Sequence, residues 1–240
     1  MRKYFPLGDT AFLIKLGNDI SIETHRKVRN LFHNLESEEI EGVIELVPSY
    51  NEIMILYEPS IISYKDLFNK IEDIDFEDTN KLAKSHKIIH IPVCYDKKYS
   101  PDMEIVAQAN QISQNEVVKI HSNPEYLVYM LGFTPGFCYL GGMDNSIATP
   151  RKENPRQLIE AGSVGIAGAQ TGVYPIDSPG GWQIIGKTPL VLFDPKRKPE
   201  FLINAGDYIK FYAISEMEFE EIRKEVSGHS YELKVERKNG

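Results

Sequence analysis

The sequence predicts two domains of different class: an α+β N-terminal domain, followed by a mostly β domain that forms a closed or half-closed barrel. Two observations predict this division. Short strands and two amphipathic helices fill the first third of the chain, whereas short apolar runs punctuated by glycine and proline dominate the rest. A charged stretch with few apolar residues, 73–87, lies between them. We therefore expect domains over residues 1–85 and 86–240.

The first domain is expected to be a small ferredoxin-like α+β layer. Residues 1–17 alternate as strand, turn and strand, and residues 20–35 have apolar side chains at helical spacing. Two further strands are expected over 43–47 and 53–57, followed by a helix over 63–74 that Ser63 caps. The order β-β-α-β-β-α predicts a sheet with helices on one side.

The second domain begins with an apolar strand over residues 88–93. Two short helices should follow, over 101–110 and 113–121, and Ser113 with Glu116 has the spacing of a capping box. The remainder reads as short strands, apart from a helix at 215–226. A closed barrel is expected because closure removes exposed strand edges.

Composition excludes several classes of function. The 240 residues carry a net charge of −8, which argues against a nucleic-acid partner, since phosphate binding requires clustered cations. Cys94 and Cys138 lack metal-ligand spacing, so no metal site is expected. No apolar run is long enough to cross a membrane or to act as a signal peptide. We therefore expect a cytoplasmic protein.

The most informative stretch is 161–190, which is rich in glycine and holds the single tryptophan, Trp182. Its apolar side chains alternate with small residues, a pattern typical of buried strands joined by tight turns. Charge is nearly absent. Two interpretations stay open: a wall of a small-molecule pocket or partner groove, or a compact barrel with tight corners.

Residues 181–188 formally match the phosphate-binding pattern G-x-x-x-x-G-K-T. A true phosphate loop lies between a strand and a helix. Here another strand, 189–193, is expected to follow, and the loop positions carry bulky side chains. We therefore reject a phosphate loop at this position.

Several polar residues are candidates for binding. Arg151 and Arg156 lie in a segment stiffened by two prolines, and guanidinium groups bind carboxylates bidentately. Gln170 and Tyr174 are polar groups in a stretch suited to burial, so each requires a partner. His121 follows a helix and is either a structural hydrogen-bonding group or a base. Each candidate also has a purely structural interpretation, and these residues alone assign no reaction.

Three segments taken together, GFTPGFCYLGG, ATPRKENPR and AGSVGIAGAQTGVYPIDSPGGWQIIGKTP, strongly resemble the KipI/PxpB family. Its members are also called allophanate hydrolase subunit 1 or carboxyltransferase subdomain C/D proteins. The resemblance covers nearly the whole chain and implies an α+β N-terminal domain and a cyclophilin-like C-terminal barrel.

The resemblance also implies partners: a homologous subunit of the KipA/PxpC type and a PxpA (LamB/YcsF) type protein. Such an assembly resembles the bacterial 5-oxoprolinase, which uses ATP to hydrolyse 5-oxo-L-proline to L-glutamate. Which chain binds ATP stays open. Other members suggest two alternatives, an inhibitor of a sensor histidine kinase and a carboxyltransferase or allophanate hydrolase-like subunit that meets carboxybiotin.

On this resemblance we assign binding roles and no catalytic group. Arg151 and Arg156 are expected to hold the substrate carboxylate, and Trp182 to cover the ring. Gln170 and nearby backbone N–H groups should face the developing oxyanion. Tyr174 and His121 complete the predicted substrate-binding set.

The chain departs from the family pattern after the strand at 88–93. Members usually carry Y-G-G-x-x-G-P-D-L there, but residues 95–103 read YDKKYSPDM. Three glycines are replaced, while Pro101 and Asp102 match and should start the next helix. The substitution leaves the identity of the substrate or partner open.

Overall fold

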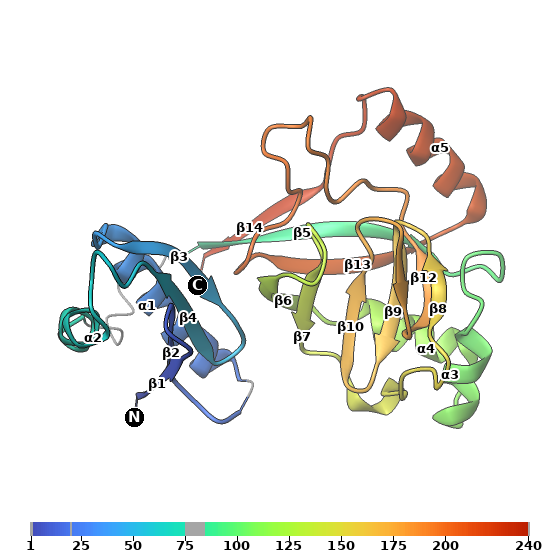
Figure 1. Cartoon of the computed structure of the whole chain (residues 1–240). Helices are drawn as coiled ribbons and strands as arrows, with labels where there is room; N and C mark the ends of the chain where they lie inside the picture. Colours follow the sequence, from blue (N-terminus) through green and yellow to red (C-terminus); the bar gives the residue numbers. More distant parts are fainter. Residues whose placement is uncertain (1, 20, 75–84, 240) are drawn as a thin grey trace. The chain divides into compact units, whose positions relative to one another are not determined.

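The computed structural model describes residues 2–19, 21–74 and 85–239. The chain forms two units, Met1–Lys84 and Ser85–Gly240 (Figure 1). Most of the charged stretch 73–87, where the sequence predicts a connection, lies outside the described residues.

The elements of the first unit follow the predicted order β-β-α-β-β-α. Its four strands form one antiparallel sheet in the order β1-β2-β4-β3. The elements are β1 (Lys3–Leu7), β2 (Ala11–Lys15), α1 (Ile22–Ser37), β3 (Val43–Pro48), β4 (Glu52–Tyr57) and α2 (Tyr64–Glu72).

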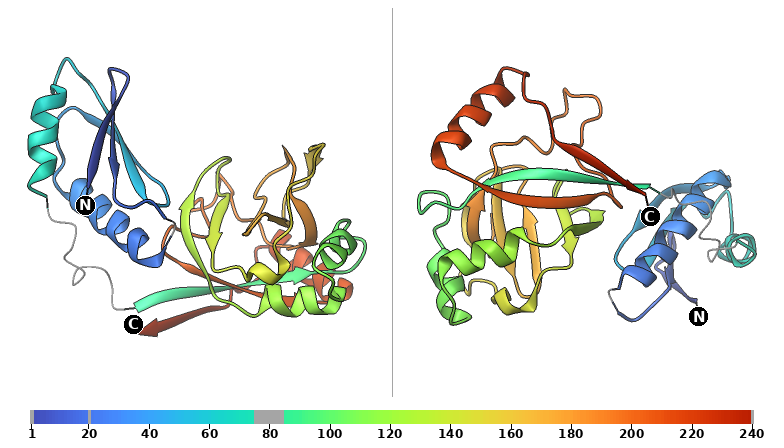
Figure 2. Two further views of the ribbon diagram at one scale, coloured as in Figure 1. Left: turned by 90° about the horizontal axis from the view of Figure 1, so that it is seen from below. Right: turned by 180° about the vertical axis from the view of Figure 1, so that it is seen from behind.

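Both helices of this unit pack on the same face of the sheet. Phe12 and Ile14 of β2 are fully buried and share one core with Leu31 of α1 and Leu67 of α2. The helices lie alongside the strands in Figure 2. Ser63 caps α2 as predicted, its hydroxyl accepting the Asp66 N–H at 3.2 Å.

The second unit is mostly β, with helices at its periphery. Its first half contains β5 (Ser85–Cys94), α3 (Met103–Ala109), α4 (Gln114–Ser122), β6 (Tyr126–Leu131), β7 (Cys138–Gly141) and the 3-10 turn η1 (Asn145–Ile147). Its second half contains β8 (Arg156–Ile159), β9 (Ser163–Ala167), β10 (Gln170–Val173), β11 (Ser178–Gly180), β12 (Gln183–Lys187), β13 (Tyr208–Ile214), α5 (Glu216–Ser227) and β14 (Val235–Asn239).

Seven strands close into a barrel, as predicted. The order is β12-β9-β10-β7-β6-β13-β5, and β12 returns to β5 where Lys187 pairs with Cys94. Strands β5 and β13 run parallel, with Tyr208 opposite Ile88 and Ile214 opposite Cys94. The barrel interior is filled by large apolar side chains, so it is a packed core; among them are Ile91, Val128, Ile166, Ile185 and Phe211.

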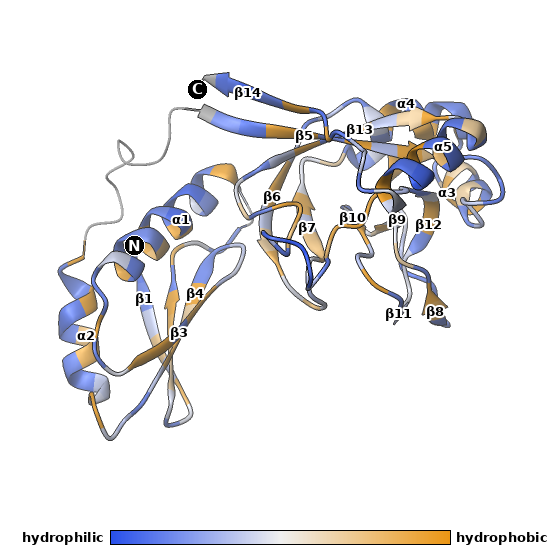
Figure 3. Cartoon of the chain, turned by 90° about the horizontal axis from the view of Figure 1, so that it is seen from above, coloured by the Kyte–Doolittle hydropathy of each residue, from blue (hydrophilic) through white to orange (hydrophobic). Residues whose placement is uncertain are grey.

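Local signals explain the helices. Ser113 and Glu116 form the predicted capping box at the start of α4, and Ser215 with Glu218 forms another at α5. Strand β14 was not predicted, because its sequence VERKN is hydrophilic apart from Val235 and is mostly blue in Figure 3. It pairs with the first half of β5, on the edge that β12 meets only at Cys94.

Candidate functional site

A buried carboxylate joins three segments of the barrel unit. Asp102 lies at the N-cap position of α3 and is 1% exposed. Its Oδ1 accepts hydrogen bonds from Arg156 Nη2 at 2.8 Å and Lys152 Nζ at 3.1 Å. Its Oδ2 accepts the backbone N–H of Ile184 at 2.7 Å. One side chain therefore fixes the segment before α3, the loop before β8, and β12 at a single point.

The charge of Asp102 is maintained in spite of its burial. Burial by itself would raise the pKa of this carboxyl group. Hydrogen bonds from Arg156, the Ile184 N–H and Lys152 outweigh that effect, and they hold the pKa below its usual value. Because its oxygens are occupied in this way, Asp102 makes no side-chain cap to its own helix.

The second feature is a cluster of buried aromatic rings beside this anchor. Phe137 contacts Trp182 edge to face, with ring centroids 5.4 Å apart and an interplanar angle of 88°. Tyr174 meets Trp182 at 6.2 Å and 81°. Tyr174 and Trp182 are 1% and 5% exposed. Ile159, Ala167 and Ile184 complete the set of buried residues in the cluster, which therefore adjoins both β8 and β12.

Glycine makes room for these rings. A Cβ atom at Gly180 would lie 2.4 Å from the hydroxyl of Tyr174 and 2.8 Å from Ile159 Cδ1, so a larger residue does not fit there. The Tyr174 phenol is also hydrogen-bonded to the backbone of Trp182, but its burial has the larger effect and raises its pKa to about 12. Tyr174 is therefore a neutral, fixed part of the wall.

The other predicted residues lie in different settings. Arg151 is exposed, and its charge lies close enough to Tyr174 to act on that phenol. Gln170 is half-buried at the first position of β10, opposite Ala167. Arg156, Tyr174 and Trp182 are thus brought together around the Asp102 anchor, with Arg151 at its solvent side.

His121 lies in the last turn of α4 and does not follow the helix as expected; its fully buried side chain stacks on Phe211 of the barrel core. Its Nδ1 is 2.8 Å from the Tyr95 hydroxyl, and its Nε2 is 2.8 Å from Thr171 Oγ1. Thr171 donates its only hydroxyl proton to the Gly165 carbonyl at 3.0 Å. His121 therefore donates from Nε2 and accepts at Nδ1, as a neutral ring. Burial lowers its pKa to about 3.

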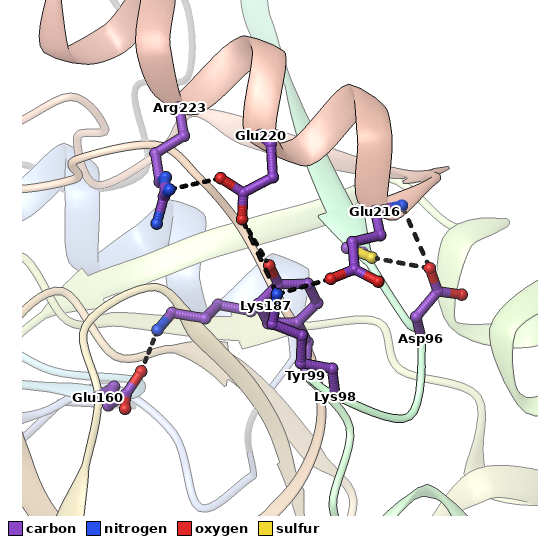
Figure 4. Close-up of polar contacts among 9 residues, drawn as sticks. Asp96, Lys98, Tyr99, Glu160, Lys187, Glu216, Glu220 and Arg223 are labelled. Atoms are coloured by element: carbon purple, nitrogen blue, oxygen red, sulfur yellow. Dashed lines mark hydrogen bonds and ion pairs between the residues drawn. The ribbon is translucent and has the colours of Figure 1, made fainter.

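A small cleft adjoins the anchor. It has a volume of about 190 Å³. Arg156 lines it from β8. Lys187 of β12 also lines it, as do Lys98 and Tyr99 from the segment after β5 (Figure 4). The remaining lining residues are Pro101, Leu158, Ile159, Glu160, Ser163 and Ile184.

Comparison with known proteins identifies the family. The sequence model of the family described as carboxyltransferase domain, subdomain C and D, matches residues 2–203. The chain belongs to this family. Its relatives include the B subunit of 5-oxoprolinase from Bacillus subtilis, 44% identical over 91% of this chain and 95% of the relative. The corresponding 5-oxoprolinase chain of Escherichia coli O157:H7 is 39% identical over 85% of this chain and 93% of that protein.

A solved structure shares the fold of this carboxyltransferase-domain chain. The urea amidolyase of Kluyveromyces lactis superposes with a TM-score of 0.81 at 21% sequence identity. The match covers 99% of this chain and 16% of the larger enzyme. At this identity the likeness supports the fold alone.

Sequence reasoning missed the main anchor of the site. Asp102 was expected only to start a helix, and α3 does begin at Met103. Lys152 lies within the family segment ATPRKENPR but received no role. The one usable signal was the Pro101-Asp102 match to the family pattern within an otherwise altered segment. Its partners Arg156 and Ile184 lie 54 and 82 residues further along the chain, which no local pattern reveals.

Two absences hold for the described part of the chain. Within residues 2–19, 21–74 and 85–239, no three or more His, Cys, Asp or Glu side chains are grouped to hold a metal ion. In the same ranges, no helix has the length and apolar character needed to cross a membrane.

Proposed function

We propose that this chain is the B-type subunit of an ATP-dependent 5-oxoprolinase that hydrolyses 5-oxo-L-proline to L-glutamate. The observation that carries the proposal is the 44% identity to the Bacillus subtilis 5-oxoprolinase chain across 95% of that protein. Its partners would be a KipA/PxpC-type and a PxpA (LamB/YcsF)-type subunit. We place the reaction in the cytoplasm.

The anchor geometry supports a binding role for the segment before β8. The substrate is an acid, and Arg151 offers an exposed guanidinium group next to a rigid wall. Arg156 is held by Asp102 at 2.8 Å, so its position is preset before substrate arrives. In this proposal Arg151 and Arg156 hold the substrate carboxylate, while Trp182 and Tyr174 shape the surface that receives the ring.

Gln170 and His121 have the two remaining roles in this proposal. Gln170, with backbone N–H groups of the glycine-rich strands, would face the oxygen that gains negative charge. His121 would be a positioning residue, because it contacts β10 through Thr171 and is itself fully buried. Neither the nucleophile nor its base is assigned to this chain.

The chemistry explains the need for ATP. Hydrolysis breaks the lactam C–N bond, adding OH to the carbonyl carbon and H to the nitrogen. The amide is stabilised by resonance, so water attacks it slowly. Phosphorylation of its oxygen would activate that carbon, and each tenfold gain in rate corresponds to about 1.4 kcal/mol.

We assign ATP to a partner subunit. Residues 183–187 form the barrel strand β12. The strand expected over 189–193 does not form, and the next regular element is the strand β13. The G-x-x-x-x-G-K-T segment therefore lacks the helix N-terminus that completes a phosphate loop. The finer fold assignment is also part of this proposal: a ferredoxin-like domain over residues 1–85 and a cyclophilin-like barrel over 86–240.

The test is reconstitution. This chain is mixed with the two partner subunits, 5-oxo-L-proline and ATP, and glutamate release is measured with each component omitted in turn. Glutamate that appears only in the complete mixture is the expected result. A stable complex without glutamate would refute this substrate and favour the carboxyltransferase alternative.

Arg151→Ala tests the binding role within that assay. The apparent KM should rise about tenfold or more, since a charge-assisted hydrogen bond is lost, while the melting temperature stays unchanged because the side chain is exposed. Lys196→Ala, at another exposed cation of the same unit, is the matched control. An unchanged KM with a lower melting temperature would remove Arg151 from the binding site.

A further inference from the structure

One wall of the cleft beside the Asp102 anchor consists of Lys98 and Tyr99, and both side chains contact helix α5. Tyr99 donates its hydroxyl proton to Glu220 Oε1 at 3.1 Å, and its ring lies 4.4 Å from that of Phe219. Lys98 donates to Glu216 Oε1 at 2.6 Å (Figure 4). These contacts hold the segment after β5 against α5, so the cleft is preformed.

Lys187 differs from the other cations that line the cleft. Arg156 binds the buried Asp102 through its Nη2, and the Lys98 side chain is 57% exposed. Lys187 is only 21% exposed, yet its ion-pair partner Glu160 is 69% exposed (Figure 4). A half-buried ammonium group is thus paired with a carboxylate that is free to move into water.

The exchange of this carboxylate costs little. Glu160 is the exposed member of the pair, so water replaces much of the contact that it loses when it leaves Lys187. An incoming acid would regain the contact with Lys187 and also bury an apolar body against Pro101, Leu158 and Ile184, which line the same cleft. Ser163, 6% exposed, offers a hydroxyl group beside them.

We infer that this cleft binds a small carboxylic acid, with Lys187 holding its carboxylate and Glu160 occupying that position when the cleft is empty. The volume of about 190 Å³ limits the ligand to a compact body such as a five-membered ring. The identity of the acid as 5-oxo-L-proline rests on the proposed function, and in this cleft its carboxylate would contact Lys187 together with Arg156, which lines the same cleft. The carboxylate site itself does not depend on turnover.

Substitution of Lys187 and substitution of Glu160 should change the Kd of the acid in opposite directions. Binding of 5-oxo-L-proline to the full chain is measured by isothermal titration calorimetry. Lys187→Gln should raise the Kd at least about tenfold, because a charged hydrogen bond to the ligand is lost. Glu160→Gln should lower the Kd by about two- to fivefold, because the competing carboxylate is removed. A purely structural pair would not produce opposite signs.

Two controls sharpen the measurement. Lys198 and Glu200 form another lysine–glutamate pair, whose side chains are 82% and 34% exposed, and neither lines the cleft. Lys198→Gln and Glu200→Gln should leave the Kd unchanged. The neutral lactam 2-pyrrolidinone, which lacks the carboxylate, should bind equally to the wild-type chain and to both cleft variants.

The outcomes separate this inference from the proposed function. Cyclopentanecarboxylate has the ring and the acid but no lactam, so opposite shifts with it support the cleft even if reconstitution yields no glutamate. Shifts of the same sign in Lys187→Gln and Glu160→Gln, equal shifts in the control pair, or no binding of either acid to the wild-type chain would overturn the inference.

Discussion

Removal of the Asp102 charge is the sharpest test of the anchor. Asp102→Asn keeps the size of the side chain but takes away the negative charge that faces Arg156 and Lys152. The amide nitrogen also replaces one of the two carboxylate oxygens, so either the Ile184 N–H or the Arg156 and Lys152 side chains face a donor in place of an acceptor. Loss of one partner of a buried ion pair costs about 3–5 kcal/mol. Arg156 and Lys152 are 28% and 24% exposed, and water screens both, so we take about 3 kcal/mol.

Trp182 provides a selective readout of this loss. It is the single tryptophan, and it is buried in the barrel unit beside the anchor. Its fluorescence therefore follows barrel unfolding without a contribution from the first unit. About 3 kcal/mol corresponds to a melting temperature lowered by roughly 6–12 °C for a domain of this size. Glu153→Gln is the matched control, because it removes an exposed carboxylate from the same loop.

The pH dependence gives a second check on the same variant. The pKa of Asp102 is lower in the folded chain than in the unfolded one, where it lies near 3.8. Its ionisation therefore adds stability above about pH 4, and this stability is lost as the pH falls through the folded value. The difference between wild type and Asp102→Asn should be largest at neutral pH and shrink below pH 4. A loss under 1 kcal/mol, or a difference independent of pH, would refute the reasoning.

Three further substitutions test other parts of the barrel through the same fluorescence. Gly180→Ala should lower the free energy of unfolding by about 1–3 kcal/mol and shift Trp182 emission to the red, since its Cβ would lie 2.4 Å from the Tyr174 hydroxyl. The control Gly181→Ala, whose Cβ would have its nearest contact at 3.5 Å, should change the free energy of unfolding little. His121 has its pKa lowered to about 3, so wild-type stability should fall by roughly 1.4 kcal/mol per pH unit from about pH 6.5 toward 3. In His121→Gln this slope should be smaller by about 1.4 kcal/mol per pH unit in urea denaturation across that range, and an unchanged slope would exclude His121 as its source. Ser113→Ala should lower the free energy of unfolding by about 1 kcal/mol, because the capping box of α4 is lost. An unchanged free energy of unfolding in urea denaturation would contradict that role.

Local patterns predicted the elements well where one face is apolar or a cap is present. The helices α1 and α4 show this, with apolar side chains at helical spacing or a capping box at the start. The prediction failed for β14, whose charged sequence pairs with β5 only because the barrel presents that edge. An alternation of apolar and polar side chains predicts a strand only where one of its faces is buried, and β14 buries almost no side chain.

The site was harder to predict than the fold for a related reason. Asp102 and Arg156 become a site only when the barrel closes and brings them within 2.8 Å. From the sequence, Asp102 was expected only to start a helix, and Arg156 was expected to hold a substrate carboxylate. Tyr174 was correctly expected to need a partner, which the backbone of Trp182 provides. What sequence reasoning lacked was long-range pairing, which depends on strand register.

The parallel pairing of β5 with β13 also constrains how the protein is made. The barrel joins residues 88–94 to residues 208–214, about 120 positions later. At roughly 5–20 residues per second, a ribosome needs on the order of ten seconds to synthesise that interval. During this time the apolar strand β5 has emerged without the neighbour that covers its edge. The nascent chain is therefore open to aggregation until β13 emerges, and chaperone dependence should be concentrated in this window rather than during release of the finished chain.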